Sequence, residues 1–389
     1  MTDAFASYQN EIYLNGLGDQ RPAYPISVLD LEKQAYEAMT PQARGYLEGG
    51  AGGGWTMRAN RTAFDRWRIV PRMLRGVAER DLSVELFGTR HPSPLLLAPI
   101  GVQTIVHDEG EVAVARAASA THTPFVLSTA ASHSMEQVAE AAGDGARWFQ
   151  LYWPNDEHLT RSFISRAEEA GYSALVVTLD TSMLAWRPAD LREAYLPFLK
   201  GEGVANYFSD PVFRASLQST PEEDPGTAIL HWVGVFSNPG YRWEDLAMIR
   251  AATDLPILLK GILHPDDARA AVEHGADGVI VSNHGGRQVD GSIASLDALP
   301  AVVSAVPENF PVLLDSGIRT GSDAVKALAL GARAVLLGRP YAWGLALGGE
   351  DGVRQVIRAF LAELDLTLAL SGHRSLETVT PDILERAPA

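Results

Sequence analysis

Eight short runs of Val, Ile, Leu and Phe recur between residues 94 and 340. Their apolar residues are contiguous and do not alternate with polar ones, which predicts strands buried on both faces and therefore parallel. The runs lie at residues 94–100, 124–129, 147–152, 174–180, 256–261, 278–284, 311–317 and 334–340.

Stretches with helical periodicity separate most of these runs, for example "SMEQVAEAAG" (134–143) and "HPDDARAAVEHG" (264–275). Several of them close on a glycine, which suits a helix C-cap. Six of the seven start-to-start spacings are 22 to 33 residues, the size of one strand–helix unit. Eight such units predict an α/β fold of the TIM-barrel type, a (β/α)8 barrel.

The spacing between the fourth and fifth runs is 82 residues and breaks this regularity. We expect residues 188–245, which are rich in aromatic residues, glycine and proline, to form a lid-like insertion over the barrel mouth, because long βα loops in barrels usually serve the site. A flexible surface insertion is the alternative. Residues 1–90 are predicted to be a helical N-terminal segment and 94–380 the barrel, with a single domain over 1–389.

Polar residues gather where the apolar runs end, and in a barrel these ends converge on one mouth, where active sites lie. Any one of them could also simply mark the end of a strand. The residues are Ser128, Thr129, Gln150, Tyr152, Thr178, Asp180, Lys260, Ser282, Asn283, His284, Asp315 and Arg339.

Two glycine-containing ends, "DSGIRTG" (315–321) and "LGRPYAW" (337–343), close the last two runs. Glycine lets backbone N–H groups approach a phosphate, and Arg319 or Arg339 would add charge, so a phosphorylated cofactor or substrate is expected. No GxGxxG fingerprint, Walker A sequence or HExxH motif occurs. We therefore expect neither a Rossmann nucleotide site nor a metal site.

Composition narrows the possible partners and compartment. A formal net charge of −16 argues against a nucleic-acid or anionic-membrane surface. No apolar stretch approaches the roughly 18 residues of a membrane span, and the N-terminus lacks the pattern of a secretory signal. The absence of cysteine fits a cytoplasmic protein.

The residues at the mouth indicate a redox reaction. A histidine held by a carboxylate, such as His284 beside Asp180, is a competent general base. Arg287 offers a planar fork to a substrate carboxylate, and the buried Lys260 can stabilise negative charge that appears during the reaction. Together they suggest proton removal coupled to two-electron transfer into a cofactor.

The motifs "SNHGGRQ", "VTLDT", "FQLY", "ILLKG", "DSGIRTG" and "GRP" occur in this chain in the order and spacing of a known family. From about residue 46 to residue 380 the chain resembles the FMN-dependent α-hydroxy-acid oxidase and dehydrogenase family. Within it, "RDLSVELFG", "NYFSDPVF" and "GRPYAWGLALGG" are more similar to the lactate 2-monooxygenase branch than to the shorter oxidases.

The resemblance implies that His284 takes the α-hydroxyl proton, supported by Asp180, while Arg187 and Arg287 hold the substrate carboxylate. It also implies that Tyr46 and Tyr152 contact the substrate. Arg187 could instead pair with an acid of the insertion, and Tyr46 could merely pack in the N-terminal segment. The implied FMN-binding residues are Pro99, Ile100, Gly101, Ser128, Gln150, Thr178, Lys260, Ser282, Asp315, Gly317, Arg319, Gly338 and Arg339.

The implied reaction is oxidation of a small L-2-hydroxy acid, foremost L-lactate, with dioxygen, followed by decarboxylation of the retained keto acid. The long insertion and Gly101, where many oxidases have alanine, favour this outcome. A peroxide-releasing oxidase is the alternative, acting on a larger acid if Ala130, where relatives carry larger side chains, widens the pocket. From another class, a flavin-independent isomerase or lyase on a phosphorylated substrate stays open. The resemblance also implies tetramers or octamers.

Overall fold

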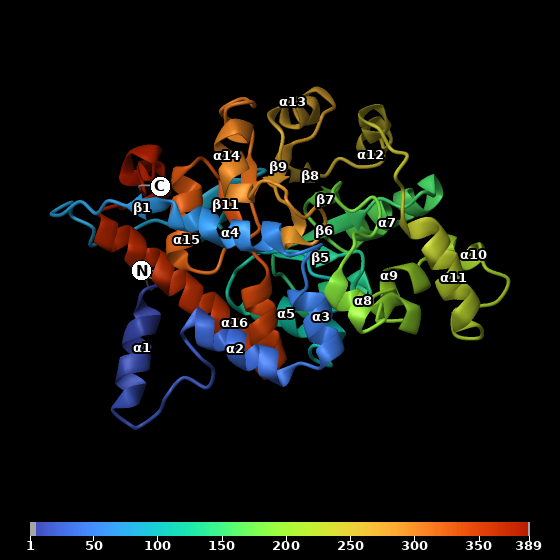
Figure 1. The fold of residues 1–389 in the computed structure, drawn as a ribbon, viewed down its shortest axis with the longest axis horizontal. Coiled ribbons are helices and arrows are strands. Elements are labelled where there is room, and N and C mark those ends of the chain that lie inside the picture. Colours follow the sequence, from blue (N-terminus) through green and yellow to red (C-terminus); the bar gives the residue numbers. More distant parts are fainter. Residues whose placement is uncertain (1–4, 388–389) are drawn as a thin grey trace.

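A computed structural model describes residues 5–387, and in it eight parallel strands close into a barrel (Figure 1). Each strand falls on one of the eight apolar runs, so the prediction of a TIM barrel is confirmed. Their order around the barrel is β10-β11-β4-β5-β6-β7-β8-β9. The strands are β4 (Leu95–Leu97), β5 (Phe125–Ser128), β6 (Arg147–Tyr152), β7 (Leu175–Thr178), β8 (Ile257–Ile262), β9 (Gly278–Val281), β10 (Val312–Leu314) and β11 (Ala334–Leu337).

Six of the eight strands end before their runs do, the exceptions being β6 and β8. Asp180, Asn283, His284 and Asp315 lie just beyond strand ends, whereas the other polar residues of the strands, Ser128, Gln150, Tyr152, Thr178 and Lys260, lie within them. Helices follow the strands, and several begin at a side-chain cap. Ser134 and Thr320 form capping boxes with Gln137 and Asp323, which satisfy two otherwise free backbone N–H groups each. The helices around the barrel are α5 (Gly110–Ala120), α6 (Met135–Ala142), α7 (Glu157–Glu169), α12 (Leu246–Arg250), α13 (Pro265–Glu273), α14 (Ser295–Val303), α15 (Gly321–Ala329) and α16 (Arg339–Ser371).

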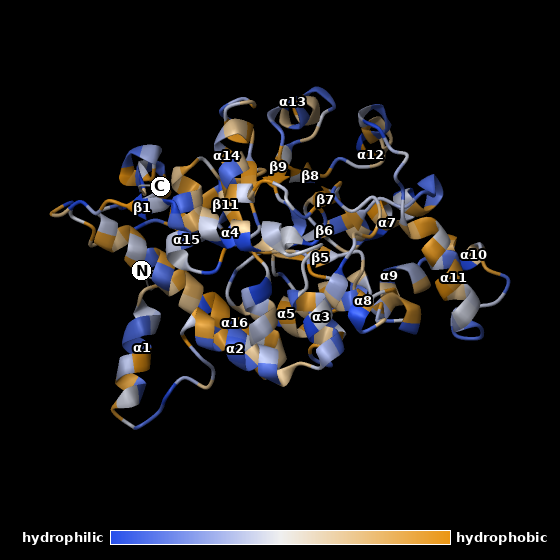
Figure 2. Ribbon diagram, in the orientation of Figure 1, coloured by the Kyte–Doolittle hydropathy of each residue, from blue (hydrophilic) through white to orange (hydrophobic). Residues whose placement is uncertain are grey.

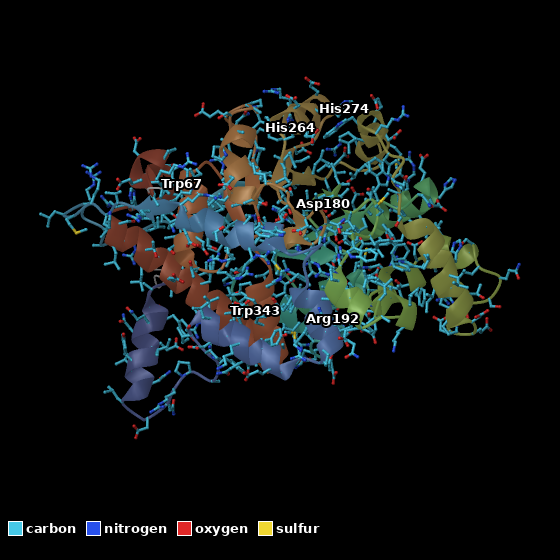
Figure 3. All side chains as sticks on the ribbon, in the orientation of Figure 1. Trp67, Asp180, Arg192, His264, His274 and Trp343 are labelled. Atoms are coloured by element: carbon cyan, nitrogen blue, oxygen red, sulfur yellow. The ribbon has the colours of Figure 1, made fainter. Side chains whose placement is uncertain are left out.

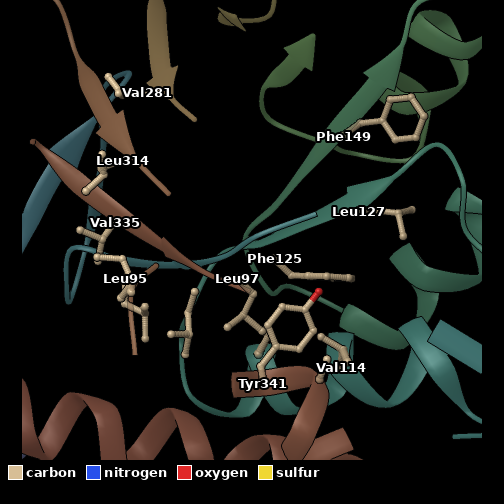
Figure 4. Packing of buried hydrophobic residues seen from close by; sticks show 14 of the residues in the cluster. Leu95, Leu97, Val114, Phe125, Leu127, Phe149, Val281, Leu314, Val335 and Tyr341 are labelled. Atoms are coloured by element: carbon tan, nitrogen blue, oxygen red, sulfur yellow. The ribbon is translucent and has the colours of Figure 1, made fainter. Parts of the chain in front are cut away.

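Successive residues of one strand enter two different apolar cores. Leu96 packs inside the barrel with Val126, Trp148 and others. The neighbouring Leu95 and Leu97 belong to the core between the barrel and the surrounding helices, where Figure 4 shows Leu95 beside Val335 and Leu97 beside Tyr341. Figure 2 accordingly shows hydrophobic colour along the barrel strands. This double burial is the reason that the runs in the sequence are contiguous.

The N-terminal segment is not purely helical, so that prediction is only partly correct. It contains α1 (Ser7–Gly16), α2 (Val28–Ala38), α3 (Pro41–Glu48) and α4 (Trp55–Asp65), and also β1 (Trp67–Ile69), β2 (Val84–Leu86) and β3 (Thr89–His91). The β2–β3 hairpin adds Val84 and Leu86 to the core inside the barrel. Strand β1 pairs antiparallel with β12 (Leu384–Arg386), which lies beyond the barrel boundary expected at residue 380.

The 188–245 insertion is folded into short helices. Its buried Asn206 donates from Nδ2 to the Thr129 carbonyl (3.0 Å) and accepts at Oδ1 from the Met135 N–H (2.8 Å). Asp210, also buried, pairs with Arg166 of α7 at 2.9 Å. These contacts fix the insertion to the barrel next to β5. It contains α8 (Pro188–Arg192), η2 (Pro197–Lys200), α9 (Ala205–Phe208), α10 (Pro211–Ala215), α11 (Pro225–Phe236) and η3 (Trp243–Asp245).

None of the helices within residues 5–387 combines the length and the apolar character that a membrane span requires.

Candidate active site

A cavity opens at the carboxyl ends of the strands and holds about 980 Å³ free of protein atoms, counting the part open to solvent. Most of the site residues predicted from the sequence line it. They are Tyr46, Pro99, Ile100, Gly101, Tyr152, Arg187, Lys260, His284, Arg287, Asp315, Gly317, Arg319, Gly338 and Arg339. The other predicted residues lie outside this lining. Ser128, Gln150, Thr178 and Ser282 are buried at the strand ends, and Asp180 contacts His284.

His284 and Asp180 form a hydrogen-bonded pair, with 2.7 Å between His284 Nδ1 and Asp180 Oδ1. Thr181, which the sequence reading missed, places its hydroxyl 3.0 Å from the same carboxylate oxygen and 3.1 Å from Nδ1. Burial opposes the charged form of Asp180, but the charges of His284 and Lys260 prevail and lower the pKa of Asp180 to about 2. Asp180 is therefore ionised and can support a positive charge on the imidazole.

Burial lowers the pKa of His284 below its ordinary value, while the charge of Asp180 acts in the opposite direction. The imidazole is therefore neutral near pH 7 and able to accept a proton. Because Nδ1 faces Asp180, the other ring nitrogen, Nε2, is the one left for a substrate.

The turn that carries His284 has an unusual backbone. His284 has a φ of 58°, in the left-handed region, and Gly285 (65°) and Gly286 (78°) continue it. Ser316, at 71°, accepts hydrogen bonds from the N–H groups of Gly285 (3.0 Å) and Asn283 (3.3 Å). A non-glycine residue in this region costs on the order of 1 kcal/mol and persists where the surroundings impose it.

Lys260 is almost fully buried beside the cavity. Its Nζ atom donates to Ser282 Oγ (3.0 Å) and lies 3.3 Å from Asp315 Oδ2. Burial would lower the pKa of Lys260, but Asp315 and Asp180 outweigh burial and raise it. The ammonium is therefore a permanent positive charge at this end of the cavity.

Two further arginines crowd together near His284. Arg187 donates to the Arg287 carbonyl (3.0 Å) and to Gln288 Oε1 (2.6 Å), with no insertion acid within ion-pair distance among the residues described. The Arg287 guanidinium donates to the Gly49 carbonyl (2.5 Å) and lies 5.1 Å from the Tyr46 ring centre. Burial and the charge of Arg187 lower the pKa of Arg287 to about 9. Asp190 of the insertion interacts electrostatically with both guanidinium groups but forms no ion pair with either among the residues described, so the two cations can still bind an anion.

A second group of arginines lies near the glycine turns after β10 and β11, and its Arg339 also donates to the Gly285 carbonyl (3.2 Å). Burial and the charges of Arg339 and Arg61 lower the pKa of Arg319 to about 10. Arg61, on α4, borders an adjoining cavity together with Gly317, Arg319 and Arg339. The sequence reading missed Arg61 because no local pattern connects the N-terminal segment to this turn. The cluster has the chemistry of a phosphate site.

In the described part of the chain, one buried polar atom of β6 is unpaired. Ser128 Oγ donates to Gln150 Oε1 (2.9 Å), whereas the buried Gln150 Nε2 has no hydrogen-bond partner within residues 5–387. A free amide donor suits a ring carbonyl. Two groups of arginines, a buried lysine and this donor fit an anionic, heteroaromatic cofactor such as FMN. Thr178 borders a neighbouring cavity instead, which shares Tyr152, Thr181 and Phe236 with the first.

One apolar part of the cavity lining is formed by Ala130, Leu184, Phe198 and Phe236. Of these residues, only Ala130 was singled out from the sequence. Leu184 comes from the loop after β7, and Phe198 and Phe236 come from the insertion. Phe198 packs edge-on against Tyr46 at 6.3 Å between ring centres. The insertion therefore supplies apolar surface next to the arginine pair, where a substrate side chain could lie.

No cluster of three or more metal-ligating side chains occurs in the part of the chain that the structure describes. In Figure 3, His264 and His274 lie at the edge of the molecule, while Asp180 lies near its middle.

A sequence model described as FMN-dependent dehydrogenase matches residues 35–386. The chain belongs to this family. It is therefore a member of a group of FMN-dependent enzymes, in agreement with the fit of the cavity, and FMN is its cofactor.

Proteins similar to this chain carry names that state different activities. An FMN-dependent alpha-hydroxy acid dehydrogenase of Penicillium citrinum is 47% identical and covers 98% of this chain and 96% of its own. An L-lactate oxidase of Lysinibacillus sphaericus is 47% identical, with 94% of each chain covered. Among solved structures, a mandelate oxidase is 38% identical with a TM-score of 0.82, covering 93% of this chain and 98% of that one.

Proposed function

We propose that this protein oxidises a small L-2-hydroxy acid, foremost L-lactate, with dioxygen, and that it decarboxylates the retained keto acid. The overall products from lactate would be acetate, carbon dioxide and water. The observation that carries the oxidation is the ionised Asp180 bonded to a neutral His284, beside Arg187 and Arg287 in one cavity.

In this proposal the arginine pair binds the substrate carboxylate, and His284 Nε2 removes the proton from the α-hydroxyl group. The Tyr46 and Tyr152 hydroxyls stay protonated, because burial raises the pKa of both groups, that of Tyr152 to about 12. They can therefore donate to the carboxylate and to the developing keto oxygen. FMN, when bound, supplies the acceptor for the hydride of the α-carbon and passes two electrons to dioxygen.

Different parts of the cavity would hold different parts of the cofactor. Arg319, Arg339 and the glycine turns at Gly317 and Gly338 would hold the phosphate, and Asp315 the ribityl chain. Lys260, held by Ser282, would balance negative charge on the reduced ring. The flavin ring would meet the polar side chains and backbone at the ends of β4 to β7, namely Pro99, Ile100, Gly101, Ser128, Gln150 and Thr178.

Decarboxylation requires that the keto acid stays in place until peroxide attacks it. Gly101 supports this outcome, since a side chain there would crowd the Ala130 carbonyl, 2.9 Å from the added carbon, and would approach the Tyr46 hydroxyl. The fixed insertion, which brings Phe198 and Phe236 over the arginine pair, also supports retention.

A peroxide-releasing oxidase is the second candidate. The printed names of relatives favour it, among them the L-lactate oxidase above and 2-Hydroxyacid oxidase 1 of Homo sapiens, 40% identical over 367 residues. The apolar surface beside Ala130 would then accommodate a larger acid. A flavin-independent isomerase or lyase is not supported, because the chain belongs to an FMN-dependent family.

Product analysis of aerobic turnover with L-lactate tests the proposal. We expect equimolar acetate and carbon dioxide without free peroxide. Formation of pyruvate and peroxide in stoichiometric amounts would show that the protein is an oxidase and does not decarboxylate the keto acid. If no 2-hydroxy acid bleaches the flavin, both the proposed reaction and the oxidase alternative would be overturned. Assembly into tetramers or octamers, a single functional domain and a cytoplasmic location stay predictions.

A further inference from the structure

Helix α4 lies outside the barrel, yet its Asn60 is bonded directly to the catalytic turn. Asn60 and Asn283 exchange two amide hydrogen bonds, each 2.7 Å long, and both side chains are buried. Asn60 Oδ1 also accepts from the Ser295 N–H at 3.2 Å, and Asn283 Oδ1 accepts from the Gly286 N–H at 3.1 Å. Asn283 immediately precedes His284, so this amide pair fixes the start of the strained turn.

The next residue of the helix, Arg61, reaches a different part of the cavity. Its Nη1 atom donates to the Gly317 carbonyl and to Asp323 Oδ2, the latter at 2.9 Å. The same carboxylate oxygen accepts from the N–H groups of Arg319 (3.0 Å) and Thr320 (3.2 Å). Arg61 thus joins α4 to the glycine turn in which the phosphate would be held.

The helix backbone approaches both turns so closely that each requires glycine. A methyl group at Gly286 would lie 2.6 Å from the Met57 nitrogen, and one at Gly317 would collide with the Asn60 carbonyl. Neighbouring helix residues point about 100° apart. Asn60 and Arg61 can therefore hold two different turns from adjacent positions.

We propose that Asn60 and Arg61 are positioning residues that set the catalytic base and the cofactor phosphate relative to each other. Asn60 acts through Asn283 on the His284 turn, and Arg61 acts through Gly317 and Asp323 on the phosphate turn. The part that concerns Asn60 rests on the proposed function, since it requires His284 as the base, whereas the part that concerns Arg61 requires only FMN binding.

Two readouts separate these roles in the full-length holoenzyme. The first is the rate of FMN release after dilution, followed by the rise of flavin fluorescence. The second is the rate of anaerobic flavin reduction by L-lactate with excess FMN, between pH 5 and pH 9. The variants are Asn60→Ala and Arg61→Ala, with Asn60→Ser and Arg61→Lys as milder replacements if the alanine variants do not fold. The charge-matched control is Arg66→Ala, since the exposed Arg66 at the end of α4 pairs only with Asp297 among the residues described.

We expect Arg61→Ala to release FMN at least tenfold faster than wild type. Its rate of flavin reduction by L-lactate, measured with excess FMN present, should stay within threefold of the wild-type rate. Asn60→Ala should release FMN within threefold of wild type, but reduce it at least tenfold more slowly and with a displaced pH profile. Arg66→Ala should match wild type in both readouts. Equal effects of both α4 variants on both readouts, or no effect, would overturn the positioning roles and leave α4 as a packing element.

The outcome also separates this inference from the proposed function. If the wild-type flavin is not reduced by lactate or by any other 2-hydroxy acid, the proposed function fails and the role of Asn60 with it. The FMN-release rate of Arg61→Ala then still decides the role of Arg61.

Discussion

Asp180 Oδ1 lies 2.7 Å from His284 Nδ1, although 104 residues separate the two in the chain. They follow different strands, β7 and β9, which come close because both pair in parallel with β8. Their contact selects which imidazole nitrogen faces the cavity. It also stabilises the positive charge that a proton from the substrate would create.

Replacing the proposed base should stop the reaction without releasing the cofactor. We expect His284→Ala to retain FMN and to lose anaerobic flavin reduction by lactate by about 10²-fold to 10⁴-fold, the usual contribution of a positioned base. Stopped-flow absorbance measures the reduction. His264→Ala, at an exposed histidine of the periphery, is the control. Bleaching of His284→Ala at the wild-type rate would refute the assignment of the base.

Removing the charge of Asp180 should change both the rate and its pH dependence. Asp180→Asn keeps the shape but loses the negative charge that raises the pKa of His284, so the pKa of His284 should fall further. The midpoint of the acid limb of the kcat/KM profile should already lie below the ordinary histidine pKa of about 6.5 in the wild type. We expect this midpoint to move to still lower pH in the variant. The maximal rate should fall about 10²-fold or more. An acid limb that moves to higher pH would contradict the sign of this coupling.

Substrate binding should weaken in alkaline solution because burial and Arg187 lower the pKa of Arg287 to about 9. Above that pH the free enzyme loses a positive charge from the proposed carboxylate site. We expect KM for lactate to rise between pH 8 and pH 10, whereas Arg287→Lys should have a raised KM throughout, since lysine lacks the planar fork. Steady-state kinetics across this range measures both. A KM independent of pH would argue against Arg287 as a carboxylate ligand.

The size of the pocket should depend on Ala130, which is buried and lines the cavity next to Gly101. In Ala130→Leu the added carbons would enter the space beside the apolar surface of Phe198. We expect KM for mandelate to rise about tenfold or more, with lactate changed less than threefold. Comparison of both substrates on both proteins measures this selectivity. An equal effect on the two acids would show that Ala130 does not set the size limit.

The insertion should lose its attachment when Asn206 is removed. The buried amide makes hydrogen bonds on both of its ends, and Asn206→Ala leaves those backbone groups unpaired. We expect the free energy of unfolding to fall by about 1–3 kcal/mol, as measured by urea denaturation of the holoenzyme. Asn309→Ala, at an exposed asparagine, should be close to neutral. Equal stabilities of the two variants would mean that Asn206 does not anchor the insertion.

The barrel could be predicted from the sequence because each strand is buried on both faces. Each strand therefore appears as a run of consecutive apolar residues that can be recognised within a few positions. Lys260 and His284 could be selected for the same reason, since a polar side chain at the end of such a run is conspicuous. The short β1, β2 and β3 could not be predicted, because they mix polar with apolar residues over only three positions, whereas the equally short β4 and β10 lie within longer apolar runs.

The residues that support the site from a distance were the ones missed. Asn60 and Arg61 lie within an ordinary amphipathic helix, and their partners Asn283 and Asp323 are more than 200 residues away. Phe198 and Phe236 belong to an insertion whose path over the cavity depends on buried contacts such as that of Asn206. A contact of this kind has no local pattern, so it becomes visible only in three dimensions.

The pairing of β1 with β12 has a consequence for biosynthesis. Helix α4 ends at Asp65, and the strand that follows it is held by residues 384–386, with a further bond from the Ala387 N–H to the Arg66 carbonyl (2.8 Å). The segment that carries Asn60 and Arg61 is translated before the eight barrel strands, whereas the partner strand of β1 is translated after all of them. The cofactor turns therefore acquire this support only after all eight barrel strands have been translated.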